Sequence, residues 1–365
     1  MWRSARFALT LGVAVLAMIS GAGVKAQEIS WNPYLEYHNG NWPDLPGVKL
    51  GVVSAIKMDP DGKHLWLLQR CGGNNCASSQ ADPIIEMTLD GKFVKSFGGG
   101  VTAFPHGFAL TSDSIWVTDG APHGDPRATV GEQLHKGDQI YKFSRDGKLL
   151  MTLGTAGGWG CDESHFNGPT GVAIGIDGHI WITDGHGGPQ RGPNKDNMFG
   201  SRGGSNRLVE LSPDGKFIHQ WGGCIGSEGD DPLQFNDPHD IEIDHSTGRI
   251  YIADRGNDRV QVLDKDGNFI TQWTQFGKPS GIAIDDKGNI YVADGMSNEH
   301  WNPGWQRGIR IADIKTGWIK AFIPDDEYTE GAGTEFVSVD INGTVYSGSS
   351  SSYGLVVHKL FRPLF

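Results

Sequence analysis

Short apolar segments separated by turn residues recur through most of the chain. In "FPHGFALTSDSIWVTDG", residues 104–120, an apolar segment precedes a polar turn and an alternating segment that ends at Asp119. Alternation with a period of two is typical of β-strands, and a short polar turn between two such segments is typical of a hairpin. The pattern therefore predicts a pair of antiparallel strands here.

The same strand pair returns in "FNGPTGVAIGIDGHIWITDG" (166–185), "FNDPHDIEIDHSTGRIYIADR" (235–255) and "FGKPSGIAIDDKGNIYVADG" (276–295). The pairs continue into a second hairpin, as in "RLVELSPDGKFIHQWG" (207–222), whose Asp-Gly turn supplies the positive φ angle that tight hairpins need. The 54 glycines of the chain fit many such turns. A four-stranded unit that repeats every 40–60 residues or so is typical of a propeller blade. We therefore predict an all-β fold, a β-propeller.

The repeat occurs six times. The predicted blades begin near Gly51, Ala103, Phe166, Phe235, Phe276 and Gly333. The sixth is short and ends in "YGLVVHKLFRPLF", so we expect the N-terminal segment "ISWNPYLEYHN" to supply its missing outer strand. No linker interrupts the series, which predicts a single propeller domain over residues 27–365.

Residues 1–26 carry the features of a secretory signal peptide. Two arginines precede an apolar run, and "VKA" places small residues before a cleavage site after Ala26. A membrane anchor is the alternative, but the flanks fit cleavage better. We expect a periplasmic or secreted protein with no membrane anchor after cleavage. The net charge of −12 disfavours nucleic acid as a partner. We expect a monomer that takes a small-molecule or peptide substrate.

The four cysteines are expected to form two disulfides, as is usual in exported proteins. Cys71 and Cys76 bracket the short loop "CGGNNC", whereas Cys161 and Cys224 lie in matching loops of neighbouring repeats. Zinc binding is the rival interpretation. Because the spacings fit no zinc-ribbon or zinc-finger pattern, the pairs Cys71–Cys76 and Cys161–Cys224 are favoured.

A ring of side chains is predicted around the central channel. The first strand of each blade lines this channel, so equivalent residues from all blades point at one axis. The predicted ring is Ser54, His106, Thr170, His239, Ser280 and Glu335. His106, His239 and Glu335 come from alternate blades and form a facial set that suits a divalent metal, most simply zinc. The small hydroxyl residues Ser54, Thr170 and Ser280 would leave room for a substrate.

Two arginines are predicted to bind that substrate. Arg70 and Arg255 end the second strands of the first and fourth blades, on the same face as His106. A guanidinium group forms bidentate hydrogen bonds with a carboxylate, so both are expected to hold a substrate carboxylate. His186, which follows a second strand in the same way, is a candidate general base.

These motifs resemble a known family. "FPHGFAL", "FNDPHDIEID", "ADRGNDRVQ" and "LSPDGKFIHQWG" are similar to NHL repeats and to peptidyl-α-hydroxyglycine α-amidating lyase, the lyase half of peptidylglycine α-amidating enzymes. The resemblance covers most of residues 50–350. It implies a six-bladed propeller with zinc held by three channel histidines, and cleavage of a peptidyl α-hydroxyglycine into a peptide amide and glyoxylate. His106 and His239 match two zinc ligands, and Arg70 and Arg255 match the active-site arginines.

Three positions depart from the family pattern. Glu335 in "GTEF" stands where the family has its third zinc histidine, and His186 in "DGHGG" stands where it has a catalytic tyrosine. Phe336 replaces a carboxylate that would help to hold a structural calcium ion. The main hypothesis is a metal-dependent lyase for a carboxylate-bearing α-hydroxy substrate of carbinolamide type. A metal-dependent hydrolase of esters, lactones or amides, and a non-catalytic NHL propeller that binds a ligand or protein, are the alternatives.

Overall fold

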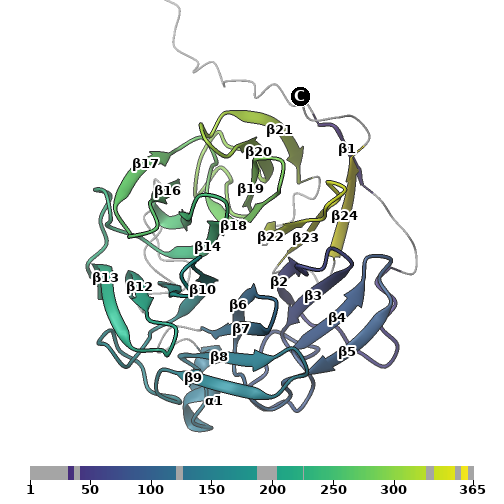
Figure 1. Ribbon diagram of the computed structural model, residues 1–365, viewed down its shortest axis with the longest axis vertical. Helices are drawn as coiled ribbons and strands as arrows, with labels where there is room; N and C mark the ends of the chain where they lie inside the picture. Colours follow the sequence, from purple (N-terminus) through teal and green to yellow (C-terminus); the bar gives the residue numbers. More distant parts are fainter. Residues whose placement is uncertain are drawn as a thin grey trace, which may run out of the picture.

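A computed structural model describes residues 32–36, 42–120, 126–186, 204–224, 226–325, 333–349 and 355–360. The predicted signal peptide lies outside these residues. Six four-stranded antiparallel sheets stand around a central axis, and each is one blade of a propeller (Figure 1). The all-β, six-bladed fold expected from the sequence is therefore confirmed.

The blades follow the chain in order. Blade 1 contains β2 (Val53–Met58), β3 (His64–Gln69), β4 (Ile84–Thr88) and β5 (Phe93–Phe97); blade 2 contains β6 (Pro105–Leu110), β7 (Ser114–Asp119), β8 (Gln139–Ser144) and β9 (Leu149–Leu153). Blade 3 contains β10 (Pro169–Ile174), β11 (Ile180–Asp184), β12 (Asn206–Leu211) and β13 (Phe217–Gly223); blade 4 contains β14 (Pro238–Asp244), β15 (Arg249–Asp254), β16 (Arg259–Leu263) and β17 (Phe269–Trp273). Blade 5 contains β18 (Pro279–Ile284), β19 (Asn289–Asp294), β20 (Gly308–Asp313) and β21 (Ile319–Pro324). The short helix α1 (Pro126–Gln133) and the 3-10 turn η1 (Arg255–Asn257) lie in loops.

Blade 6 joins the two ends of the described chain. It contains β22 (Thr334–Val339), β23 (Val345–Ser349), β24 (Leu355–Leu360) and, as its outer strand, β1 (Tyr34–Glu36). In the antiparallel register, Tyr34 pairs with Leu360 and Glu36 pairs with His358. The predicted closure of the ring by the N-terminal segment is confirmed.

The core lies between neighbouring blades. Each second strand places one large aromatic side chain there, and all six are buried: Trp66, Trp116, Trp181, Tyr251, Tyr291 and Tyr346. The inner strands are covered by blades on both sides, whereas outer strands such as β5 and β9 are partly exposed. Because a blade cannot bury both of its faces alone, the hydrophobic contact between blades stabilises the whole ring.

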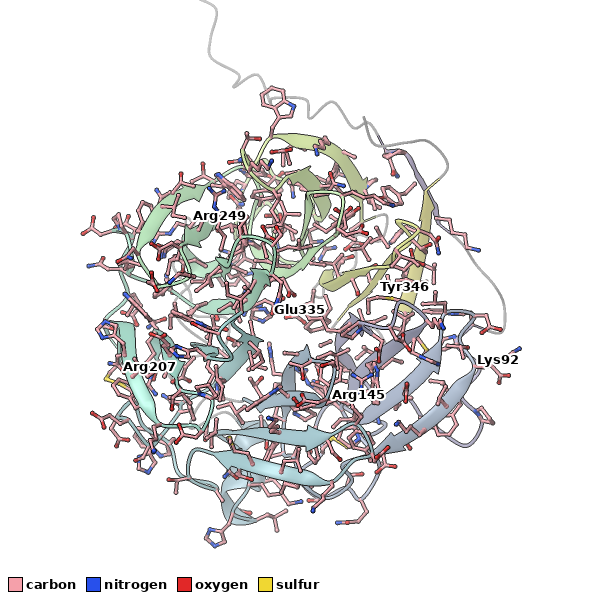
Figure 2. All side chains as sticks on the ribbon, viewed as in Figure 1. Lys92, Arg145, Arg207, Arg249, Glu335 and Tyr346 are labelled. Carbon is pink, nitrogen blue, oxygen red and sulfur yellow. A yellow bond between two sulfur atoms is a disulfide. The ribbon has the colours of Figure 1, made fainter. Side chains whose placement is uncertain are left out.

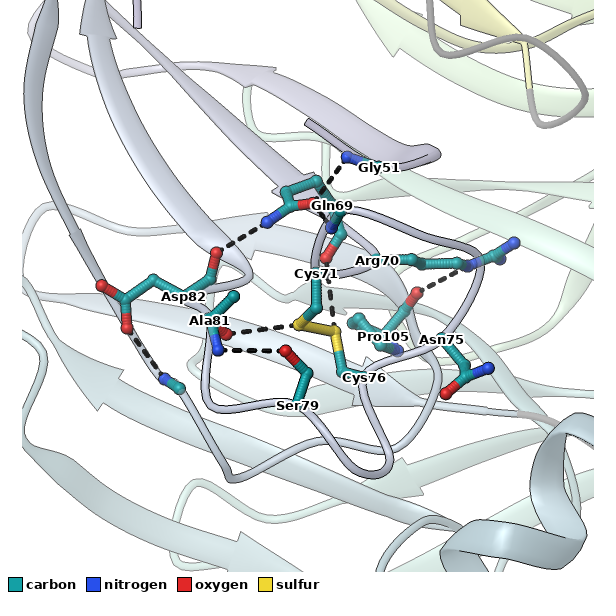
Figure 3. Close-up of a disulfide and its surroundings, with 12 residues drawn as sticks. Gly51, Gln69, Arg70, Cys71, Asn75, Cys76, Ser79, Ala81, Asp82 and Pro105 are labelled. Atoms are coloured by element: carbon teal, nitrogen blue, oxygen red, sulfur yellow. Dashed lines mark hydrogen bonds between the residues drawn. A yellow bond between two sulfur atoms is a disulfide. The ribbon is translucent and has the colours of Figure 1, made fainter. Parts of the chain in front are cut away.

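Both predicted disulfides are present, Cys71–Cys76 and Cys161–Cys224. The first closes a loop that follows β3 (Figure 3), and the second joins the loops on either side of blade 3. These loops lie at the end of the propeller where the first strands begin. The described residues contain no helix that is long and apolar enough to cross a membrane.

Candidate functional site

A β-bulge occurs at the start of the first strand of every blade. In β14, Pro238 pairs with Asp254 and Asp240 pairs with Ala253, so His239 is left out of the register. The register skips the predicted ring residue in the same way in all six blades: Ser54, His106 (with Gly107), Thr170, His239, Ser280 and Glu335. A bulge redirects the side chain of the extra residue. The repeated bulge explains how the ring residues can face the axis, where Figure 2 shows Glu335.

Two histidines of this ring are fixed by the backbone of the next blade. Nδ1 of His106 lies 2.9 Å from the carbonyl oxygen of Thr170, and Nδ1 of His239 lies 2.8 Å from that of Ser280. A carbonyl only accepts hydrogen bonds, so each Nδ1 carries the proton and each Nε2 presents a lone pair. Both Nε2 atoms are buried and have no hydrogen-bond partner among the described residues. Metal-binding histidines are commonly held in this way.

His186 joins these two imidazoles. It follows β11 and is only 3% exposed. Its ring centre lies 4.9 Å from that of His106 and 5.6 Å from that of His239. One ligand atom from each of the three histidines lies within 4.8 Å of the others. The structure therefore brings together a compact group of three imidazoles.

The surroundings keep the two ring histidines uncharged. Burial lowers the pKa of His106 well below its usual value, and the nearby His239 and Arg70 lower it further. Burial likewise lowers the pKa of His239, with Arg255 as the next cause. Neutral imidazole is the form that binds a metal, so both side chains are ready to act as ligands at neutral pH.

Glu335 lies at the edge of this group and contacts an arginine. Its Oε1 atom is 3.4 Å from Nε2 of His239 and 3.3 Å from Nη1 of Arg255. Arg255 is fully buried, and its Nε donates to Oδ2 of Asp237 at 2.7 Å. Arg255, which was predicted to bind an anion, thus lies beside the imidazoles. Its buried Nη2 group forms no hydrogen bond with the described residues.

Arg70 is held between a ring and a loop. Its guanidinium carbon lies 3.6 Å above the centre of the Phe104 ring, and its Nη1 donates to Oδ1 of Asn74 at 2.9 Å. Its Nε donates to the carbonyl oxygen of Pro105 at 3.4 Å (Figure 3). Asn74 belongs to the loop closed by the Cys71–Cys76 disulfide. This disulfide therefore supports a side chain that was predicted to bind substrate.

The predicted hydroxyl residues of the ring differ in their bonding. Ser54 donates to the carbonyl of Leu68, and Thr170 donates to that of Pro238 at 2.7 Å. The hydroxyl of Ser280 has no partner among the described residues. All three line a narrow axial cavity together with His106 and His239. Their role in substrate binding stays a prediction.

The repeat that organises these residues is a known one. The NHL repeat model matches residues 235–263 and 276–301, which include the inner strands of blades 4 and 5. The chain is thus an NHL-repeat, six-bladed β-propeller. A gluconolactonase structure from Xanthomonas campestris aligns with 90% of this chain and 95% of its own at a TM-score of 0.54 and 16% identity, a likeness of fold alone.

Similar proteins include named amidating enzymes. Human NHL repeat-containing protein 3 is 32% identical over 262 residues, which cover 69% of this chain and 64% of that protein. Peptidyl-glycine alpha-amidating monooxygenase B of Xenopus laevis is 28% identical over 338 residues, 84% of this chain and 34% of that protein. The probable peptidyl-alpha-hydroxyglycine alpha-amidating lyase of Caenorhabditis elegans is 26% identical over 233 residues, 60% and 57%. The chain spans less than two thirds of each relative, and it resembles the amidating lyases as the motifs indicated.

Sequence reasoning did not foresee two features of the site. It treated His186 as a general base and Glu335 as a metal ligand, whereas the compact group of ligand atoms contains His186. It also did not foresee that Asp237 would pair with Arg255. The sequence position of Asp237 could have indicated that it lies near the site. It comes two residues before His239 and directly before the proline of that bulge.

Proposed function

We propose that this chain is an exported, metal-dependent lyase that cleaves a carboxylate-bearing α-hydroxy substrate of carbinolamide type. The observation that carries the proposal is the group of three buried imidazoles beside a buried arginine. Relatives named as amidating lyases support the reaction class.

The donor set fits a divalent metal. His106 and His239 each present a buried Nε2 lone pair that no described group satisfies. Leaving such an atom unpaired is costly, and a metal ion at the axis would satisfy both. Neutral imidazoles are standard ligands of zinc. A bound divalent cation supplies a Lewis acid that lowers the pKa of a hydroxyl group coordinated to it.

The protein's own residues would hold and orient the substrate. Nη2 of Arg255, which has no hydrogen-bond partner among the described residues, would bind a carboxylate oxygen, and Arg70 would supply a second positive charge. Two fixed charge-assisted contacts would orient the carbinol carbon toward the imidazoles. The narrow, protein-lined axis would limit the water around that carbon.

The cleavage conserves atoms and needs no oxidant. The hydroxyl of the substrate loses its proton, its oxygen forms a carbonyl, and the adjacent carbon–nitrogen bond breaks. The electron pair of that bond goes to the amide nitrogen, which takes up a proton. For a peptidyl α-hydroxyglycine the products are a peptide amide and glyoxylate. Two side chains, His186 and Glu335, are available for the third ligand position and for proton transfer.

The two disulfides support an oxidising location. Cys71–Cys76 and Cys161–Cys224 use all four cysteines of the chain. Structural disulfides persist in the periplasm and outside the cell but are rare in a reducing cytosol. Together with the predicted cleavage after Ala26, this favours a periplasmic or secreted enzyme.

A second candidate is a non-catalytic NHL propeller that binds a ligand or a protein. The observation that favours it is the 32% identity to a relative named only for its NHL repeats. Such a module would not need the buried imidazole group, and His106→Ala should then fold and bind its ligand normally. The metal content of the purified protein distinguishes the two candidates.

The test combines elemental analysis with product detection. The protein, exported and purified without added chelator, should contain about one equivalent of a divalent metal. An N-acyl α-hydroxyglycine should yield glyoxylate and the acyl amide in equal amounts. His106→Ala should lose both metal and activity, whereas His219→Ala, at an exposed position of β13, is the matched control. A metal-free, fully folded protein that produces no glyoxylate would refute the proposal, and cleavage of neutral lactones alone would replace it with a hydrolase.

A further inference from the structure

The three clustered imidazoles come from three consecutive blades. His106 belongs to β6 of blade 2, His186 follows β11 of blade 3, and His239 belongs to β14 of blade 4. The sequence-based set of His106, His239 and Glu335 would instead use blades 2, 4 and 6. The two arrangements differ in which side of the ring supplies the third ligand.

The distances between side chains favour His186 over Glu335 as the third ligand. The ring centres of His106 and His239 are 4.7 Å apart, and that of His186 lies at a similar distance from each. With one ligand atom from each residue, all separations are at most 4.8 Å. Zinc–nitrogen bonds of about 2 Å place ligand nitrogens in a tetrahedral site a little over 3 Å apart. Small side-chain rotations would close the group around an ion.

Glu335 already has a partner of opposite charge. Its Oε1 atom lies 3.3 Å from Nη1 of Arg255, inside a site where both groups are buried. Asp237 holds the Nε end of the same guanidinium. Removing Glu335 from this pair to bind a metal would leave the arginine with less compensation, and breaking a buried pair is costly.

We propose that His186 is the third protein ligand of the metal and that Glu335 positions Arg255 for the substrate. This inference rests on the proposed metal site and specifies its composition. Relative to the family pattern, the number of imidazoles is kept at three, but the third is supplied by blade 3 in place of blade 6. Glu335 then helps to hold the guanidinium of Arg255 beside the imidazoles.

Measured metal affinity can distinguish a metal ligand, the role proposed for His186, from a positioning residue, the role proposed for Glu335. This measurement does not depend on enzyme activity. The chelator-treated protein would be titrated with Co²⁺, whose visible absorption reports the number and kind of ligands. His186→Ala should weaken binding by more than about 100-fold, the upper range for loss of a supporting residue, whereas Glu335→Gln should weaken it by less than about tenfold. Glu335→Gln should instead raise the KM for a carboxylate substrate. His219→Ala should leave the titration unchanged.

Each outcome decides one question. If His186→Ala keeps the wild-type affinity and spectrum while Glu335→Gln loses them, this inference is wrong and the metal proposal stands. If the wild-type protein takes up no Co²⁺, the proposed function fails as well. If His186→Ala does not fold, His186→Asn provides the comparison, because it keeps a polar side chain at this position.

An independent observation concerns the part of the channel that lies farther along the first strands than the ring residues. Lys57 lies on β2 of blade 1, and its ammonium group forms an ion pair with Glu242 on β14 of blade 4. Its Nζ atom is also 3.5 Å from the carbonyl oxygen of Ile282 on β18. β2 and β14 approach the axis from opposite sides of the ring (Figure 1). The lysine side chain therefore crosses the channel and joins three blades.

The residues around this part of the axis do not fit the structural calcium ion that the family resemblance implies. Phe336 and Val337 line the cavity with apolar surface. Among the described residues lining it, Asp240 is the one carboxylate, and its two oxygens accept hydrogen bonds from the backbone of Ile241 and Ile282. Calcium requires six to eight oxygen ligands or so, and the ammonium group of Lys57 would repel it.

We infer that Lys57 supplies the axial positive charge in place of a divalent cation. Its ammonium group compensates Asp240 and Glu242 and ties blades 1, 4 and 5 together. Burial alone would lower the pKa of Lys57, but Glu242 and Asp240 raise it above its usual value, so the charge is retained. A fixed internal cation makes the stability of the ring independent of calcium.

Thermal unfolding tests this inference. The melting temperature of the wild-type protein should change by less than about 1 °C between excess CaCl₂ and EGTA. Lys57→Met should lower it by at least about 5 °C, because two partly buried carboxylates lose their compensation, and the double variant Lys57→Met/Glu242→Met should recover part of the loss. Lys320→Met, which removes a less buried pair with Asp313, is the control. A calcium-dependent rise of several degrees in the wild type, or an unchanged Lys57→Met, would overturn the inference.

Discussion

Nη1 of Arg255 lies 3.3 Å from Oε1 of Glu335, and this contact connects the imidazole group to the arginine that we propose binds the substrate carboxylate. Asp237 holds the other end of the guanidinium at 2.7 Å. Two carboxylates thus fix one fully buried cation. Burying these three charges costs desolvation energy, so the group is weak evidence for a stabilising role, and the proposed recognition of a substrate anion gives the buried guanidinium a function.

The first prediction concerns Arg255. Arg255→Lys keeps the charge but removes the planar fork, so kcat/KM for a carboxylate-bearing α-hydroxy substrate should fall about 30- to 1000-fold, equivalent to roughly 2–4 kcal/mol. An analogue in which the carboxylate is a neutral amide should lose much less. Steady-state kinetics on both substrates, after circular dichroism has verified folding, provide the measurement. Equal losses of kcat/KM on the two substrates would show that Arg255 does not recognise the carboxylate.

The second prediction separates the two disulfides. Loss of Cys71–Cys76 loosens the loop that carries Asn74, so Arg70 should lose its support and kcat/KM should fall several-fold. Loss of Cys161–Cys224 should leave kcat/KM nearly unchanged but cost more stability, because that bridge closes a sequence separation of 63 residues against 5. Chain entropy gives about 4 against about 2 kcal/mol.

Serine pairs at each bridge would be compared by kinetics and by urea unfolding. Thiol labelling of the denatured, unreduced wild type should detect no thiol group. A Cys71→Ser/Cys76→Ser protein with wild-type kcat/KM would argue against a role for this loop in holding Arg70.

Much of the fold was predictable because its signals are local. Turn residues and alternating apolar positions define each hairpin, and repetition of the hairpins defines the blades. The same repetition placed His106, His239 and Glu335 on one axis, since equivalent positions in equivalent blades must lie around the ring. Periodicity does not extend into irregular loops, so the sequence placed His186 at the site as a candidate general base but did not predict that its ligand atom would lie with those of His106 and His239. Nor does sequence pattern reveal which carboxylate will compensate a buried arginine, as Asp237 does.

The third prediction concerns ring closure by β1. Tyr34 is 2% exposed and packs in the core between blades 5 and 6, so Tyr34→Ala should cost about 3–5 kcal/mol of unfolding free energy. A chain that begins at residue 42 would lack β1 and expose the edge of β24, which favours aggregation. Calorimetry and size-exclusion chromatography would measure both effects, with a chain that begins at residue 31 as the control. A monomeric truncated chain with an unchanged melting temperature would show that closure by β1 is dispensable.

The last prediction is a pH dependence of the metal-free protein. Burial holds the pKa of His106 and of His239 well below 6.5, their value in the unfolded chain. As the pH falls through 6.5, the unfolded chain binds protons that the folded state does not, so folding stability decreases on acidification. Between pH 7.5 and 5.5 each histidine should lower the free energy of unfolding by about 1.4 kcal/mol.

Asp119 and Asp240 act in the opposite sense, since burial raises the pKa of each to about 6 and the folded state takes up their protons. The pH dependence of the free energy of unfolding therefore contains both effects. The contribution of the two histidines is the difference in this pH dependence between the wild type and His106→Gln/His239→Gln. Urea unfolding of both metal-free proteins should show a wild-type loss that is larger by about 2.7 kcal/mol over this range. Identical losses would mean that the two imidazoles take up protons in the folded protein as readily as in the unfolded chain, which contradicts their lowered pKa values and their readiness to bind a metal.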